Sequence, residues 1–144
     1  ASALAAQRSA LSDPSNWVIL PEIISKEPLG PAVRQGDDAW ADIVRWVLYG
    51  IISAEEVGIT SANVDSFGPD TKNPQIVRML GLDDTNLGGM LGLDNDFLKR
   101  AIKQVGNYGE IFERHIGMNT PVGLPRGVNE QWTNGGLIYS PPFN

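Results

Sequence analysis

Residues 20–40 read LPEIISKEPLGPAVRQGDDAW, a proline-rich run that leads into the start of a helix. Pro21, Pro28 and Pro31 fall within eleven residues of one another. Proline has no backbone N–H for a β ladder and restricts the residue before it to extended geometry. We therefore expect an irregular, extended connector that crosses between two bodies. Because the run lies so close to the start of the chain, we also expect the 144 residues to be a piece of a larger protein.

The main helix is predicted to begin directly after this run. Asp37 follows a glycine and is a good N-cap, and Gly58 suits the position that follows a helix end. The residues between them at helical spacing form an apolar inner face, namely Trp40, Ile43, Val44, Val47, Ile51 and Ala54. The opposite face is expected to be solvated and carries Asp38, Asp42, Arg45, Tyr49, Ser53 and Glu56.

Other segments also predict helices, with one or two short strands near the N-terminus. Residues 1–11 are alanine-rich and predict a short helix. Residues 17–20 form a β-rich run that Pro21 stops and that residues 23–24 could extend. A second long helix is expected from Asp94 or Asn95 to about Ile116, and the last ten residues are expected to be extended and packed.

Two similar five-residue words predict repeated helix ends. MLGLD occurs at residues 79–83 and again at 90–94, eleven residues later. Two copies do not make a repeat protein. We interpret each as a stop signal, in which an apolar pair precedes a glycine just past the helix end and an aspartate caps the next helix.

The composition excludes several classes of function. A net charge of −6 argues against nucleic acid as a partner and gives no support for an anionic membrane. The chain has no cysteine, so disulfides, thiolate catalysis and cysteine-based zinc sites are excluded. The longest apolar run, residues 43–52, contains Arg45 and is too short to span a membrane.

No group of residues predicts catalysis or metal binding. His115 is the only histidine and suits a helix C-terminus. The acidic and amide residues at 83–86 and 94–96 fail the spacing of a calcium loop and are better explained as caps. The adjacent carboxylates at 37–38 and 55–56 point to different sides of a helix. The residues alone thus indicate a helix-rich globular piece that is not an enzyme and has no cofactor.

Five stretches resemble a known family along the whole chain. They are LPEIISKEPLGPAVR at 20–34, GITSANV at 58–64, GLDND at 92–96, QVGNYGEIFER at 104–114 and GLIYSPPF at 136–143. They look very like the C-terminal portion of the periplasmic substrate-binding proteins of general L-amino-acid ABC transporters. The resemblance covers a little under half of a typical member.

The resemblance implies an α/β, two-lobed binding protein that closes around an L-amino acid and delivers it to the transporter's membrane subunits. Residues 1–26 would complete the second lobe, 27–36 would cross back as a hinge, and 37–144 would form the helical C-terminal part of the first lobe with its extension. The protein would be periplasmic.

The resemblance also implies that most ligand contacts lie outside this chain. An aspartate that holds the ligand's ammonium would fall immediately before Ala1, and the groups that hold the carboxylate would come from the other half. Ser2 is the one ligand-binding residue that the resemblance assigns here. The fragment is expected to self-associate or to pair with its missing N-terminal half. The alternative reading is a stand-alone helical module that binds other proteins.

Overall fold

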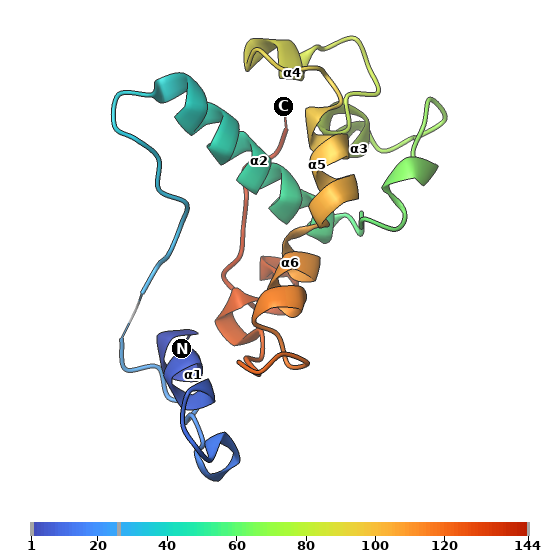
Figure 1. Ribbon diagram of the computed structural model, residues 1–144. Coiled ribbons are helices and arrows are strands. Elements are labelled where there is room, and N and C mark those ends of the chain that lie inside the picture. Colours follow the sequence, from blue (N-terminus) through green and yellow to red (C-terminus); the bar gives the residue numbers. More distant parts are fainter. Residues whose placement is uncertain (1, 26, 144) are drawn as a thin grey trace. The chain divides into compact units, whose positions relative to one another are not determined.

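The fold is a set of short helices joined by long loops (Figure 1). The computed structural model describes residues 2–25 and 27–143; Ala1, Lys26 and Asn144, which fall within the predicted ranges 1–11, 1–26 and 37–144, lie outside it. The α-helices are α1 (Ser2–Ser9), α2 (Asp38–Glu56), α3 (Pro74–Met79), α4 (Leu87–Met90), α5 (Phe97–Val105) and α6 (Tyr108–His115). The described residues also form four single 3₁₀ turns: η1 (Pro14–Asn16), η2 (Val64–Ser66), η3 (Gly127–Asn129) and η4 (Trp132–Asn134).

The mainly helical prediction is confirmed, but the short strand near the N-terminus is not formed. The run from Trp17 to Leu20 has no regular secondary structure, and the described residues contain one isolated β-bridge, between Gln131 and Ile138. A strand needs a hydrogen-bonded neighbour, and the described residues offer none to this run.

The chain divides into two compact units. The first comprises the residues up to Ala32 together with Phe112–Arg126, and the second comprises Val33–Ile111 together with the residues from Gly127 onward. In the described part of the chain, no helix combines the length and the apolar character needed to cross a membrane.

The predicted ends of the main helix are confirmed by their hydrogen bonds. The Asp37 carboxylate accepts a bond from the backbone N–H of Trp40 at 3.2 Å. Gly58 has a φ of +73°, and the N–H of Ile59 donates to the Ala54 carbonyl at 2.7 Å. This six-residue closure is a Schellman motif, which satisfies carbonyls that the helix leaves unpaired.

The same closure ends α3 and α4, as the repeated word MLGLD predicts. Gly81 and Gly92 follow these helices with φ values of +66° and +69°. In each case the residue after the glycine donates its N–H to the carbonyl five residues earlier, at 2.9 Å. The same glycine-based C-terminal motif therefore ends both α3 and α4.

The predicted second long helix is wrong, because it breaks into α5 and α6. Gly106 has a φ of +86° and a ψ of −178°, a conformation that glycine adopts readily and other residues do not. Asn107 then starts α6: its Oδ1 accepts from the N–H of Glu110 at 2.9 Å, while the Glu110 carboxylate accepts from the N–H of Asn107 at 2.8 Å. This reciprocal capping box was present in the sequence as Asn-x-x-Glu and outweighed the continuous apolar spacing.

The core of the second unit lies between α2 and α5, which pack side by side (Figure 1). Its most deeply buried apolar side chains come from α5, from the end of α3 and from the segments after α2 and α3, namely Ile59, Val64, Met79, Leu80, Leu98 and Ile102. The C-terminal segment runs along α2, where the Phe143 ring lies 5.2 Å from the Trp46 ring. Phe143 is buried, so the predicted packing of the tail is confirmed at its end, whereas Leu137 and Tyr139 are 76% and 63% exposed and are not packed down as predicted.

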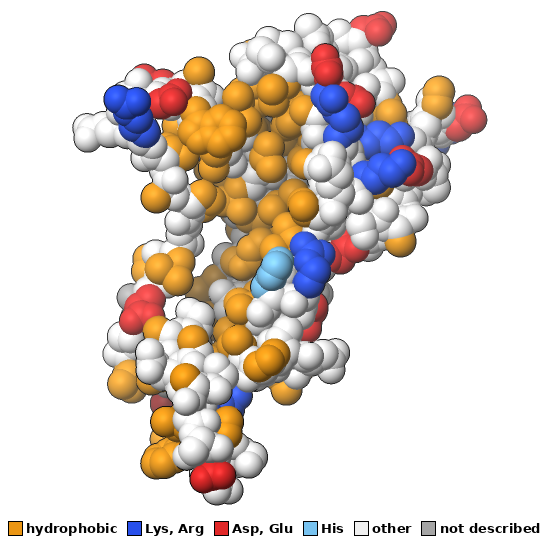
Figure 2. Space-filling model, viewed as in Figure 1, with side chains coloured by type: hydrophobic (Ala, Val, Ile, Leu, Met, Phe, Trp, Pro, Cys, Tyr) orange, Lys and Arg blue, Asp and Glu red, His pale blue; other side chains and the backbone are white. Residues whose placement is uncertain are grey.

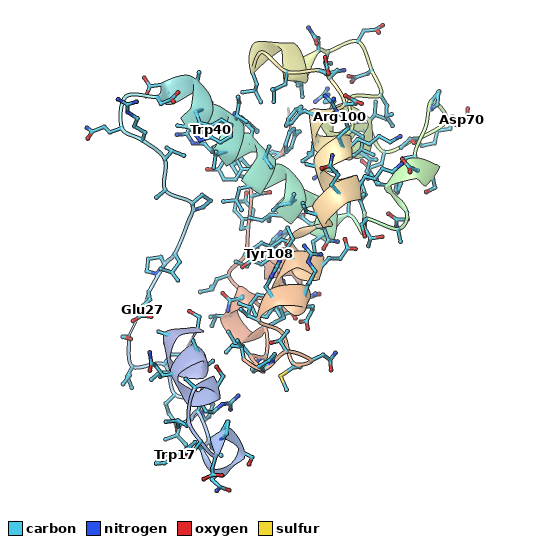
Figure 3. All side chains as sticks on the ribbon, viewed as in Figure 1. Trp17, Glu27, Trp40, Asp70, Arg100 and Tyr108 are labelled. Carbon is cyan, nitrogen blue, oxygen red and sulfur yellow. The ribbon has the colours of Figure 1, made fainter. Side chains whose placement is uncertain are left out.

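The burial of three residues of α2 differs from the prediction, and one of them is Tyr49, which was expected to be solvated but packs against the core. Trp40, on the first turn, is 52% exposed (Figure 3), because the fully buried part of α2 is its last half from Gly50 to Ala54. Ser53 was predicted to be solvated but is buried, and its Oγ lies 2.7 Å from the Oγ of Ser140. The C-terminal segment covers this polar face, so a helical period measured on α2 alone could not predict its burial.

Candidate functional site

Ser2 is the first residue of α1 and is half-buried. Three alanines favour the helix that positions it, and one of them, Ala5, is completely buried. A serine at a helix start lies among backbone N–H groups that have no partner within the helix. This geometry is compatible with a polar ligand but does not by itself make a site.

The other end of α1 is held by Arg8. Its guanidinium donates from Nη2 to the backbone carbonyl of Val122 at 3.0 Å, across a long stretch of sequence. This bond joins α1 to the loop that follows α6 inside the first unit. The next residue, Gly123, has a φ of +58°, and a Cβ there would lie 3.3 Å from Nη2 of Arg8, so glycine leaves room for the guanidinium.

An open groove of about 240 Å³ lies between α1 and the extended run that follows η1. Trp17, labelled in Figure 3, lines it from the extended run. The other lining residues are Leu4, Gln7, Arg8, Leu11, Val18 and Ile19. The groove is mainly apolar, so it suits a packing partner better than a zwitterion, whose charges need polar partners.

The structure does not bring the polar candidates from the sequence together into one site. His115 is exposed at the end of α6. Asp94 and Asp96 both pair with Arg100 at 2.8 and 3.1 Å, at the start of α5. Over residues 2–25 and 27–143, no three histidine, cysteine or acidic side chains are grouped so that they could hold a metal ion.

Asn95 has a structural role that the sequence did not reveal. Its Oδ1 accepts from the N–H of Gly88 at 3.3 Å, and its Nδ2 donates to the carbonyl of Asp83 at 3.1 Å. Asp83 and Asp94 do not cap the next helices as predicted, because the N-cap positions belong to Asn86 and Asp96. The amide of Asn95 therefore holds this acidic loop together through backbone groups.

A buried polar layer between α2 and the C-terminal segment was also missed. Gln131 is almost fully buried and donates from Nε2 to the Ile52 carbonyl at 3.0 Å and to the Glu55 carboxylate at 3.2 Å. With the Ser53–Ser140 bond, these contacts fix the segment along the helix. An isolated glutamine and serine give no sequence signal for such pairing.

The pKa of Asp65 is lowered from its ordinary value. The ammonium of Lys103 lies 2.7 Å from its Oδ2, and the hydrogen bond from Lys103 is the main reason that the pKa of Asp65 is lowered. A carboxylate whose pKa is lowered in the folded state stabilises that state above its unfolded pKa. This contribution is lost as the pH falls through the folded-state pKa.

Replacing Lys103 with methionine is therefore expected to raise the pKa of Asp65. The shift can be measured by NMR titration of the side-chain carboxyl carbon. Lys99→Met is the matched control, because Lys99 contributes least among the groups that lower this pKa. A rise with Lys99→Met as large as that with Lys103→Met would contradict the assignment.

Comparison with known proteins identifies relatives along nearly the whole chain. The chain is 58% identical over 143 residues to the glutamate/glutamine/aspartate/asparagine-binding protein BztA of Rhodobacter capsulatus. It is 56% identical over 142 residues to the general L-amino acid-binding periplasmic protein AapJ of Rhizobium johnstonii. These matches cover 99% and 98% of this chain but only 42% and 41% of the two relatives.

A solved structure agrees with these relatives. The periplasmic binding protein of an ABC transporter from Brucella ovis, with glutathione bound, matches with a TM-score of 0.90 and 53% identity. The match covers 99% of this chain and 44% of that protein. No protein-family model matches the chain. In sequence and in fold, the chain therefore matches one part of the periplasmic binding proteins of amino-acid ABC transporters, and it spans about two fifths of the length of these relatives.

Proposed function

We propose that this chain is part of an extracytoplasmic solute-binding protein that captures L-amino acids for an ABC importer. The observation that carries the proposal is the 56–58% identity, over nearly the whole chain, to two proteins named for amino-acid binding. The glutathione-bound relative fits the same ligand class, because the glutamyl end of glutathione carries a free α-amino and α-carboxylate group. The protein would act in the periplasm, as a binding protein and not as an enzyme.

The proposed division of the chain follows from that function. Residues 1–26 would complete the second lobe, 27–36 would be the hinge crossover, and 37–144 would belong to the first lobe with its helical extension. The described residues around Pro28 and Pro31 are exposed and have no regular secondary structure, as expected of an extended connector between two bodies. Ligand binding would close the hinge and present the closed form to the membrane subunits.

The same proposal limits what this chain can do by itself. A two-lobed protein encloses its ligand between complementary surfaces. With about two fifths of the relatives' length, the chain would supply few of those contacts. We assign Ser2 to the ligand contacts, with its hydroxyl donating to or accepting from the amino acid.

Replacing Ser2 with alanine is expected to weaken amino-acid binding about 3- to 10-fold in a protein of the relatives' full length, the effect of losing one hydrogen bond. Ser9→Ala is the matched control, because Ser9 lies at the other end of α1 and bonds to the Ala6 carbonyl. Equal amino-acid affinities for the Ser2 and Ser9 variants would show that Ser2 does not contact the ligand. That result would not contradict the proposed function.

The function itself can be tested by thermal unfolding of the longer protein in the presence of each L-amino acid. A ligand present at 100 times its dissociation constant stabilises the folded state by about 2.7 kcal/mol. We expect a rise in melting temperature with at least one L-amino acid. No rise with any of them would contradict the proposal. The alternative of a stand-alone interaction module is not favoured by the comparisons, since every relative reported above continues well beyond the matched region.

A further inference from the structure

The least exposed residues of α1 lie on one face of the helix. Ala5 is completely buried and Ser2, Arg8 and Ser9 are partly buried, whereas the residues between them are exposed. A spacing of three or four residues places these four side chains on the same face. The unit that contains α1 also contains the stretch Phe112–Arg126, although more than a hundred residues of sequence separate the two.

The hydrogen bond of Arg8 shows which segment lies against this face. Its Nη2 donates to the Val122 carbonyl at 3.0 Å, and a Cβ at Gly123 would lie 3.3 Å from the same nitrogen. The loop backbone therefore approaches the guanidinium at two successive residues. A hydrogen bond from a charged donor is stronger than one between neutral groups. The loop after α6 is thus attached to α1 through Arg8.

This loop has a fixed backbone of its own. The N–H of Leu124 donates to the Ile116 carbonyl at 2.9 Å, which closes the loop at its base. Inside the loop, the hydroxyl of Thr120 donates to the Gly117 carbonyl at 2.8 Å. Leu124 is buried. The carbonyl of Val122 is therefore held in place by the loop itself, and does not depend on Arg8 for its position.

The stretch that carries the loop continues into the second unit at both of its ends. The boundary between Ile111 and Phe112 falls inside α6, so a single helix runs from the second unit into the first. The chain returns to the second unit after Arg126, whose guanidinium carbon lies 5.1 Å from the centre of the Phe112 ring. In the division proposed above, α1 belongs to the second lobe, whereas α6 and the loop after it belong to the first.

We propose that Arg8 ties the second lobe to the first outside the hinge and restricts how far the two lobes open. This inference rests on the proposed function, because it uses the division into lobes. The lobes are then joined by the crossover at 27–36 and also by the bond from Arg8 to Val122. A second attachment limits the rotation that a hinge permits. A narrower range of open forms leaves less conformational freedom to be lost when the ligand binds.

The restraint is tested in a protein of the relatives' full length by measuring the distance between two nitroxide labels. The labels are attached to cysteines placed at Ala6 on α1 and Arg45 on α2, which are both exposed, and these 144 residues contain no native cysteine that would compete. Pulsed electron spin resonance without any amino acid gives the distribution of distances. Arg8→Met is expected to broaden this distribution and shift it to longer distances, because methionine cannot donate to the Val122 carbonyl.

Three further variants separate the hydrogen bond from other effects. Arg8→Lys is expected to restore most of the narrow distribution, because an ammonium group can still donate to a single carbonyl. Gly123→Ala crowds Nη2 of Arg8 and is expected to shift the distribution in the same direction as Arg8→Met. Arg100→Met is the matched control, since Arg100 pairs with acidic side chains inside the second unit and its loss is expected to change nothing.

The proposal would be overturned if Arg8→Met left the distribution as it is in the parent protein, or if Arg100→Met broadened it equally. Equal broadening by Arg8→Lys and Arg8→Met would also overturn it, because the hydrogen bond would then not be the restraint. All these distances are measured without amino acid. The thermal unfolding experiment described above can therefore refute amino-acid capture while the restraint is confirmed, and the reverse result is equally distinguishable.

Discussion

Replacing Leu98 with alanine is expected to lower the free energy of unfolding by about 2–5 kcal/mol. Leu98 lies on α5, is completely buried and belongs to the core that α2 and α5 share. Alanine would remove its apolar contacts and leave a cavity between two rigid helices, which relax only in part. Urea unfolding followed by circular dichroism measures the loss. A change below about 1 kcal/mol would show that α5 is not held against the core as described.

A double-mutant cycle with Gly50 tests the same contact more closely. A Cβ at Gly50 would overlap the end of the Leu98 side chain, so α2 carries glycine where α5 approaches. Gly50→Ala alone is expected to destabilise the protein. In the Leu98→Ala background the same change is expected to stabilise it by up to about 1 kcal/mol, because alanine is the better helix former and the space is now free. Additive effects of the two substitutions would contradict this close approach.

Replacing Asn107 with alanine is expected to cost about 2–4 kcal/mol. The Asn107 side chain accepts from the N–H of Glu110 at the start of α6, and its Nδ2 donates to the buried carbonyl of Ile59 at 2.8 Å. Alanine would remove the helix cap and leave the Ile59 carbonyl without this donor. The N–H of Glu110 would lose its side-chain acceptor, while the Glu110 carboxylate would keep the backbone N–H of residue 107 and its bonds from Ser61. Chemical denaturation measures the loss.

Asn107→Ser separates the two contributions. Serine is a good N-cap but is too short to donate to Ile59, so an intermediate loss of stability is expected. If serine and alanine were equally destabilising, the cap would contribute nothing, and the assignment of the break between α5 and α6 to this capping box would be wrong.

The helix ends of the second unit could be predicted because their signals are local. Asp37, Gly58 and Gly81 each act within one turn of chain, through a side-chain cap or a positive φ. The signal for the break between α5 and α6 is also local, because Gly106 is followed by the capping residues Asn107 and Glu110. The break was not predicted because apolar residues keep their helical spacing across Gly106. Such spacing does not reveal that the direction of the helix axis changes.

The features that could not be predicted depend on contacts with residues far away in the sequence. Ser53 is buried because Ser140 lies against it, and Trp40 is exposed because α2 packs through its last half. Trp17–Leu20 has the composition of a strand but lacks a neighbour among the described residues. Figure 2 shows hydrophobic side chains gathered over α2 on its visible face, where helical spacing had predicted a covered core. The candidate site has the same limitation, since Ser2 was assigned from family resemblance and not from any pattern around it.

Titration calorimetry with a panel of L-amino acids, performed in parallel on a protein of the relatives' full length and on the 144-residue chain, tests the proposed function most directly. Saturable heat is predicted for the longer protein with at least one amino acid, and none is predicted for the 144-residue chain, which spans about two fifths of the relatives' length. The absence of heat from the longer protein with every amino acid would contradict amino-acid capture. Binding of equal affinity by the 144-residue chain would contradict the assignment of most ligand contacts to the rest of the protein.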